Sequence, residues 1–247
     1  HCYRVTWRFK PSPYNVLCKG MVNVSRSYKH INFEGKQKQI MCGLVGFLTN
    51  RASELKDLGA LTTRMADTLE HRGPDDAGTW VNEQLGVALG FRRLSIIDLS
   101  PAGHQPMASS GGRFIVAFNG EIYNHLELRA ELLTAGAAPV WRGHSDTETL
   151  LAGFEHWGVD VTLAKTVGMF AVALWDVRER TLHLARDRFG EKPLYYGYID
   201  GSFVFGSQLK CFSDFPRWEK VIDPDALELY FEYGYVPSPR SIFKNIQ

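Results

Sequence analysis

The chain has 247 residues, of which 45% are hydrophobic and 22% are charged, and its formal net charge is +1. This composition is typical of a globular protein with a sizeable core. No apolar run approaches the ~20 residues that a membrane-spanning helix needs, which excludes a membrane partner. Four cysteines are too few for a disulfide scaffold, and no secretion signal is evident, so we expect a reducing, cytoplasmic setting.

The charge is unevenly distributed along the chain. Residues 1–40 contain eight Lys or Arg residues and one acidic residue, Glu34, whereas the rest of the chain is mildly acidic. This basic segment has neither helical nor strand periodicity, so we predict a leader or pro-segment outside the fold. A transit peptide and a nucleic-acid-binding arm are the alternatives. The acidic remainder argues against nucleic acid as a partner.

From Met41 onward the sequence pattern becomes regular. Residues 43–48 (GLVGFL) form a continuous apolar run that predicts a buried strand. Apolar residues then recur every three or four positions from Leu55 to Leu69, which predicts a helix with Ser53 as its N-cap. Residues 86–89 and 113–118 predict two further strands.

Two helices are predicted in the middle of the chain, each by a capping pattern. Asn124 with Glu127 precedes LELRAELL, and Ser145 with Glu148 precedes TLLAGFEHW. Four short apolar runs separated by tight turns follow, as in antiparallel meanders: MFAVALWD, TLHLAR, LYYGYI and SFVFGS. Asp223-Pro224 then predicts the start of a last helix. Strands on both sides of a helical middle predict an α+β layered domain rather than alternating βαβ units.

Cys42 is the candidate catalytic residue. A cysteine beside a glycine on an apolar strand is usually a core residue. Met41 changes this interpretation, because removal of an initiator methionine or of the leader would make Cys42 the first residue. The thiol, with an intrinsic pKa of about 8.5, would then lie beside an α-amine of pKa about 7.7–8.0 that can accept its proton. The arrangement fails if the amine stays in a peptide bond, because an amide nitrogen is not a base.

Seven motifs occur in order along the chain: MCGLVGF, EHRGPDDAG, RRLSIIDLS, HQPM, FNGEIYNH, HSDTE and ARDRFGEKPLYY. Together they resemble the N-terminal glutaminase domain of glutamine-hydrolysing asparagine synthetases, a class II glutamine amidotransferase. The resemblance runs from Met41 to about Phe243. It implies the N-terminal nucleophile fold, a four-layer αββα sandwich of two antiparallel sheets. It also implies hydrolysis of L-glutamine to glutamate and ammonia.

The resemblance assigns roles to individual residues. Cys42 would attack the amide, and the Asn119 side chain with the Gly120 N–H would bind the oxyanion. Arg93 would hold the substrate carboxylate and Asp146 its ammonium. The rest of the implied pocket is Glu121 and the backbone of Leu94, Ser95, Ile96 and Ile97.

Each assignment has a simpler alternative. Asn119-Gly120 is a common hairpin-turn dipeptide. Arg92 and Arg93 are a solvated charge pair in the simpler interpretation, and Asp146 is a first-turn helix charge. Arg186-Asp187 is similar to a family motif near the interface with the partner domain, although an internal ion pair explains it equally well.

The resemblance also implies partners. The glutaminase domain, predicted at residues 41–228, needs no cofactor, and the remaining histidines have no metal-ligand spacing. ATP and Mg would be needed only by a C-terminal synthetase domain, whose Gly-rich loop does not occur here and to which residues 229–247 would begin a linker. Whether the chain forms a homodimer is left open. Two other functions are left open: a non-catalytic glutamine-binding module, and an N-terminal nucleophile hydrolase acting on another amide.

Overall fold

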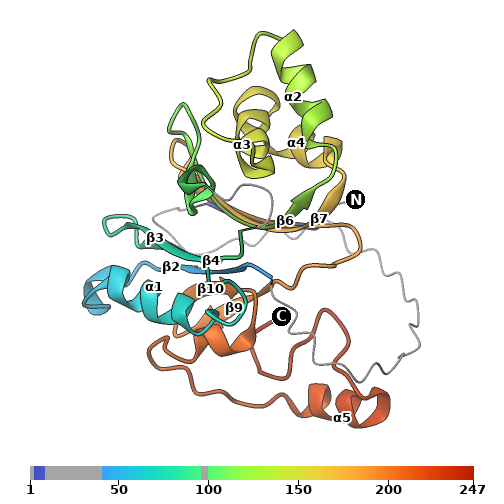
Figure 1. The fold of residues 1–247 in the computed structure, drawn as a ribbon. Coiled ribbons are helices and arrows are strands. Elements are labelled where there is room, and N and C mark those ends of the chain that lie inside the picture. The colour runs from blue at the N-terminus through green and yellow to red at the C-terminus, as the bar shows by residue number, and fades with distance from the viewer. Residues whose placement is uncertain (1–2, 9–40, 96–99) are drawn as a thin grey trace.

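The computed structural model describes residues 3–8, 41–95 and 100–247, and within them two antiparallel sheets are stacked face to face (Figure 1). The first sheet has the strand order β1-β8-β7-β6-β5. Its strands are β1 (Tyr3–Arg8), β5 (Met107–Ala108), β6 (Phe114–Ile122), β7 (Gly168–Asp176) and β8 (Thr181–Arg186). The second sheet has the order β3-β4-β2-β10-β9. Its strands are β2 (Gly43–Leu48), β3 (Asp76–Asn82), β4 (Val87–Arg93), β9 (Tyr195–Ile199) and β10 (Ser202–Gly206).

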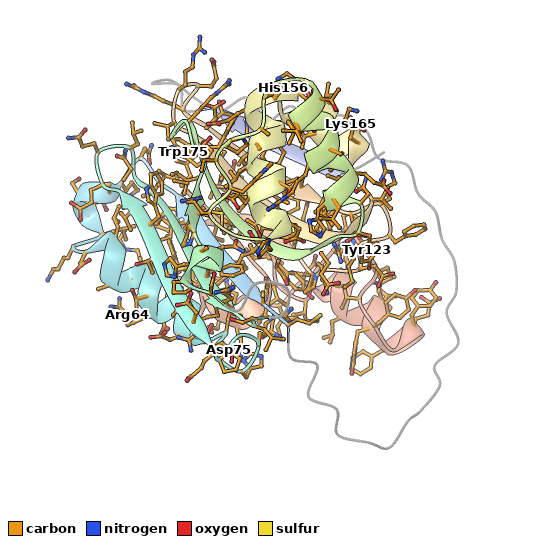
Figure 2. The ribbon with its side chains drawn as sticks, turned by 45° about the horizontal axis from the view of Figure 1, so that its top comes forward. Arg64, Asp75, Tyr123, His156, Lys165 and Trp175 are labelled. Carbon is orange, nitrogen blue, oxygen red and sulfur yellow. The ribbon has the colours of Figure 1, made fainter. Side chains whose placement is uncertain are left out.

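Helices cover the outer faces of both sheets. The helices of the described residues are α1 (Leu58–Asp67), α2 (His125–Thr134), α3 (Asp146–Trp157), α4 (Val159–Lys165) and α5 (Pro224–Tyr233), of which α5 lies away from both sheets (Figure 1). The helix α1 packs on the second sheet, and α2, α3 and α4 lie on the far side of the first (Figure 1). Arg64 on α1 and Lys165 on α4 accordingly lie at opposite sides of the molecule (Figure 2).

The alternation of side chains along each strand builds the layers. In β6, Ile115 and Ala117 join the core between the sheets, whereas Val116 and Phe118 join the core beneath α3. Trp175 on β7, labelled in Figure 2, is fully buried between the sheets. Because neighbouring residues of one strand belong to different cores, the order of layers is helix, sheet, sheet, helix. The predicted αββα sandwich of two antiparallel sheets is confirmed.

Of the four predicted helix starts, the N-cap residue is correct at α2, α3 and α5 and wrong at α1. Ser145 caps α3, with its side chain accepting from the Glu148 N–H at 3.3 Å, and Asp223 caps α5. Asp57, and not Ser53, caps α1, since its carboxylate accepts from the Ala60 N–H at 2.8 Å. The residue before α2 is Asn124, as predicted, but its side chain makes no cap hydrogen bond. It donates to Lys165 O and accepts from the Val167 N–H, which joins α2 to the segment before β7.

Several elements differ from those expected. The strand β3 and the short helix α4 were not predicted, because neither has a long apolar pattern. The strand β6 continues past Phe118 to Ile122, which places Asn119 and Gly120 inside a strand. Pairing of Asn119 with Ala171 and of Gly120 with Phe170 fixes this register, so the hairpin-turn alternative is wrong.

Both ends of the described chain contact the sheets. Residues 3–8 form β1, which pairs with β8, although the sequence predicts no strand there. The rest of the predicted leader lies outside the described residues, and its role stays a prediction. Residues 245–247 exchange backbone hydrogen bonds with Tyr196 and Tyr198 of β9, and Ile246 is buried. The prediction of a linker at 229–247 also stays a prediction, although its last residues pack against the domain. Within the described residues, the helices all fall short of the length and hydropathy that a membrane crossing requires.

Gly46 in β2 provides a test of the packing. A Cβ at Gly46 would lie 2.4 Å from both Ala88 O and the Phe205 ring, so Gly46→Ala should lower the free energy of unfolding by about 1–3 kcal/mol in urea denaturation. Gly59→Ala is the control, since its Cβ would lie no closer than 3.3 Å to Asp57 and alanine favours the helix. Equal stability of the Gly46→Ala variant and the wild type would contradict the packing of β2.

Candidate active site

Cys42 lies immediately before β2 and is held at both its backbone and its thiol. The Leu94 N–H donates to Cys42 Sγ at 3.3 Å, and Arg72 Nε donates to Cys42 O at 3.0 Å. These contacts follow from the pairing of β2 with β4, because the register that aligns Gly43 with Arg92 brings the end of β4 beside residue 42. The half-buried side chain also packs against the core between the sheets. The thiol is therefore fixed at one end of β2, the middle strand of its sheet.

The surroundings of the thiol act on its pKa in opposite directions. Burial raises the pKa of Cys42, because a buried thiolate loses its hydration. The hydrogen bond from the Leu94 N–H and the charges of Arg93 and Lys192 lower it, and burial prevails. The thiol therefore needs a base to become a nucleophile. The Cys42 nitrogen is bonded to Met41 in this chain and is not that base.

Asn119 offers a hydrogen-bond donor that the described residues do not use. Its side chain is 1% exposed, and Nδ2 has no hydrogen-bond partner among the described residues. Leaving a buried polar group unpaired costs about 1–3 kcal/mol, so such a group is typical of a site that receives a ligand acceptor. Gly120 follows it in β6, and a Cβ there would lie 2.2 Å from Met169 O. Only glycine therefore allows β6 and β7 to approach this closely.

Asp146 and Glu121 form an acidic pair where β6 meets α3. Asp146 is the first residue of α3 and is 4% exposed, and its carboxylate accepts from the Ile122 N–H at 2.8 Å. Burial raises the pKa of Asp146 to about 6, with the negative charge of Glu121 adding to the effect and the Ile122 hydrogen bond opposing it. A nearby cation would relieve this cost, so the pair is suited to binding an ammonium group.

Arg93 is not a solvated charge. It is 8% exposed, and Nη1 donates to Ser100 O at 3.1 Å. A Cβ at Gly103 would lie 2.0 Å from Nη2, so the guanidinium packs directly on the segment 100–103. The solvated-pair alternative is therefore wrong for Arg93. Arg92, in contrast, forms ion pairs with Asp67 and Glu70 at 3.3 and 3.6 Å.

Gln105 connects the two halves of the site. Its side chain accepts from the Phe118 N–H at 2.6 Å and donates to Phe118 O at 3.3 Å and to Thr147 Oγ1 at 3.4 Å. Gln105 follows the segment that holds Arg93, Phe118 precedes Asn119, and Thr147 follows Asp146. The contacts of Gln105 thereby connect the chain segments next to Arg93, Asn119 and Asp146, the predicted cation, oxyanion donor and anion.

The remaining predicted pocket residues are only partly described. The Leu94 N–H is directed at the thiol, whereas the Ser95 N–H donates to Asp75 at 2.8 Å. Ile96 and Ile97 lie outside the described residues. Their place in the pocket stays a prediction.

Three site residues were not singled out from the sequence: Arg72, Gln105 and Lys192. Arg72 is 4% exposed and Lys192 7% exposed, which is unusual for side chains of this charge. Each of the three lies inside one of the seven motifs, but a motif alone does not show which of its members are buried. Among the described residues there is no group of three or more His, Cys, Asp or Glu side chains that could hold a metal ion.

A separate cavity of about 290 Å³ lies beside α3. Its lining includes Ser109, Arg142 and Glu148 but none of the predicted site residues. Cavity volume therefore does not point to the predicted site residues.

A family model described as a glutamine amidotransferase domain matches residues 41–247. The chain belongs to this family. The family model begins at Met41, one residue before the predicted nucleophile. The resemblance seen in the seven motifs is thereby confirmed for the glutamine amidotransferase domain.

Curated relatives of this glutamine amidotransferase domain carry related names. A putative glutamine-hydrolyzing asparagine synthetase of Mycobacterium tuberculosis is 40% identical over 221 residues, covering 84% of this chain and 33% of that protein. Glutamine-hydrolyzing asparagine synthetase 1 of Bacillus subtilis is 38% identical over 208 residues, covering 84% and 32%. A protein of Gibberella zeae named amidase chry2 is 34% identical over 189 residues, covering 72% and 28%. The chain thus spans about a third of the length of these relatives.

Solved structures share the fold. The glutamine phosphoribosylpyrophosphate amidotransferase of B. subtilis superposes with a TM-score of 0.58 at 20% identity, covering 70% of this chain and 43% of that one. At this level of identity the similarity supports the sandwich fold and carries no residue roles.

The raised pKa of Asp146 predicts a pH dependence of stability. Between pH about 4 and 6 the folded state keeps a proton on Asp146 that the unfolded state has released, so stability falls as pH rises through this range. The wild type should therefore lose up to about 3 kcal/mol relative to Asp146→Asn, as measured by urea denaturation at pH 4 to 7.

Asp176→Asn is the matched control, because the pKa of Asp176 is lowered. Burial alone would raise this pKa, but the hydrogen bonds and charge of Arg113 and the hydrogen bonds from the Glu179 and Arg178 N–H groups together outweigh burial. The difference in unfolding free energy between this variant and the wild type should stay nearly constant from pH 4 to 7, because a lowered pKa confines its pH dependence to pH below about 4. If the unfolding free energies of Asp146→Asn and the wild type change in parallel with pH, Asp146 is not a buried carboxyl with a raised pKa.

Proposed function

We propose that this domain hydrolyses L-glutamine to glutamate and ammonia with Cys42 as the nucleophile. The observation that carries the proposal is the combination of a fixed thiol, a buried unused donor on Asn119, and one cation and one anion in connected positions. A free amino acid carries both a carboxylate and an ammonium, so Arg93 and Asp146 match its two charges. The Cys42 thiol would then face the side-chain amide.

The chemical step follows from these groups. The thiolate attacks the amide carbon of glutamine, and the carbonyl oxygen becomes an oxyanion. The Asn119 side chain and the Gly120 N–H would donate to it, and each such donor contributes about 3–4 kcal/mol. Collapse of the intermediate breaks the C–N bond, ammonia leaves with the proton taken from the thiol, and a thioester remains. Water then attacks the thioester, and glutamate departs.

The proposal requires a free amine on Cys42. Removal of residues 1–41 would expose it, and the amine would then accept the thiol proton directly or through one water. The chain as it stands keeps this nitrogen in a peptide bond. If it stays so, the runner-up function, a glutamine-binding module without turnover, applies. Mass spectrometry of the purified protein distinguishes the two by the residue at which the chain begins.

The use of the ammonia is a second part of the proposal. This chain covers only about a third of the relatives named asparagine synthetase, so we infer that a C-terminal synthetase domain receives the ammonia and amidates aspartate activated by ATP and Mg. The described cysteines, Cys42 and Cys211, are free, which suits a cytoplasmic setting. A homodimer is compatible with this reaction and is not required by it.

Replacement of the nucleophile is the first test. We expect Cys42→Ala to abolish glutamate release, because no other described thiol lies in the site, and to leave the thermal unfolding temperature nearly unchanged. Cys211→Ala is the matched control, since Cys211 is fully buried in the core beneath α1 and should be dispensable for activity. A Cys42→Ala protein that keeps most of the wild-type rate would rule out the proposed function.

The second test addresses the substrate carboxylate. Arg93→Ala should raise KM for glutamine by about 10- to 100-fold, because a charge-assisted contact contributes roughly 1.5–3 kcal/mol. Arg93→Lys keeps the charge but not the two-pronged geometry, so its KM should lie between those of the wild type and Arg93→Ala. An unchanged KM would show that the carboxylate contact is misassigned.

The same assay tests whether other amides are substrates. One relative of this chain is named an amidase, which is the reason for this test. N-acetylglutamine lacks the ammonium that Asp146 would bind. If it is hydrolysed as well as glutamine, a pocket for the free amino acid is the wrong assignment.

A further inference from the structure

Lys192 lies beside the nucleophile although no step of the proposed reaction uses it. It belongs to the segment between β8 and β9, and its side chain is buried. The Lys192 ammonium approaches the Met41 sulfur at 3.3 Å, one residue before Cys42. A buried lysine is costly, since its ammonium loses hydration, and a thioether is only a weak acceptor. Its position therefore calls for an explanation beyond packing.

The segment that carries Lys192 is built rigidly. The Asp187 carboxylate accepts from the backbone N–H groups of Lys192, Glu191 and Phe170 at 3.3, 3.1 and 3.1 Å. The Arg186 guanidinium donates to Lys192 O and to Gly190 O. Asp187 is 2% exposed, so this network is shielded from water. The backbone that carries the Lys192 side chain is therefore held in place by the fold.

Three cations surround Cys42 from different elements. Arg72, which follows α1, binds the Cys42 carbonyl. Arg93, at the end of β4, is bound to Ser100 O and, in the proposed function, also to the substrate carboxylate. Lys192 approaches from the β8–β9 segment. Of the three, Lys192 alone has neither a structural acceptor at Cys42 nor an assigned contact with the substrate.

We propose that Lys192 is a positioning residue that stabilises the thiolate of Cys42. Burial disfavours the negative sulfur, and a fixed cation nearby offsets that cost. The proton leaves Sγ for the base, Lys192 keeps its own proton, and no bond to Lys192 forms or breaks. The role in turnover rests on the proposed function. The charge effect on the thiol does not, since it needs only the Lys192 ammonium held at Met41, one residue before Cys42, in the chain as it stands.

Alkylation of the full chain with iodoacetamide measures this effect directly. Only the thiolate reacts, so the rate against pH reports its fraction, and mass spectrometry of the peptide containing Cys42 separates it from the other cysteines. Lys192→Met keeps the length of the side chain and removes the charge. We expect its midpoint to rise by roughly 0.5–1 pH unit, which lowers the rate about 3- to 10-fold below the midpoint. Lys192→Arg should keep the wild-type midpoint.

Several outcomes would overturn the inference. One is a Lys192→Met protein whose alkylation midpoint equals that of the wild type. Another is a midpoint shift of equal size in Lys192→Met and Lys192→Arg, which would indicate an effect of packing and not of charge. Lys192→Gln is measured beside them, so that an unchanged midpoint in either folded uncharged variant decides against the proposal.

The assay also separates this inference from the proposed function. A shifted midpoint in a protein that hydrolyses no glutamine would leave the role of Lys192 intact while the function fails. Conversely, normal glutaminase activity with an unshifted midpoint would leave the function intact while the role of Lys192 fails.

Discussion

The antiparallel pairing of β2 with β4 is the constraint on which the site depends. It places the residue before β2 beside the residues that end β4, so one register supplies the thiol, the Leu94 N–H that binds it and the Arg93 charge. A shift of one residue would turn every side chain of β2 to the opposite face. The buried positions of Leu44 between the sheets and Val45 beneath α1 prevent such a shift. Core packing therefore fixes the geometry of the nucleophile.

The site contains buried polar and charged groups that lower the stability of the domain, and the packing of the core offsets their cost. Asn119 has a buried donor without a partner in the described part of the chain, Asp146 is a buried carboxyl with a raised pKa, and Lys192 is a buried ammonium. Each of these is unfavourable in the free domain. A substrate with an amide oxygen and an ammonium group would satisfy the first two at once. The same features that weaken the empty domain would thus favour the bound state.

Much of this arrangement could be predicted from the sequence, and the rest could not for physical reasons. Apolar runs such as GLVGFL and MFAVALWD predicted β2 and β7, because buried strands need continuous apolar residues. The strand β3 has half-exposed residues and no such run. Ser53 looked like a cap, but Asp57 lies where the helix begins. Of the site, Arg93, Asn119 and Asp146 were predicted from the motifs and are buried, while their roles stay predictions. The motifs also contain Gln105 and Lys192, but their contacts join distant segments that no local pattern encodes.

The strand β1 gives the upstream segment a second connection to the domain. It occupies the edge of the first sheet by pairing along the whole of β8, from Thr181 to Arg186. Cleavage before Cys42 would allow this strand to depart, and β8 would then present unpaired N–H and C=O groups to its surroundings. Release of the nucleophile would in that case also leave β8 as an unpaired edge strand, to which a strand from another molecule could bind.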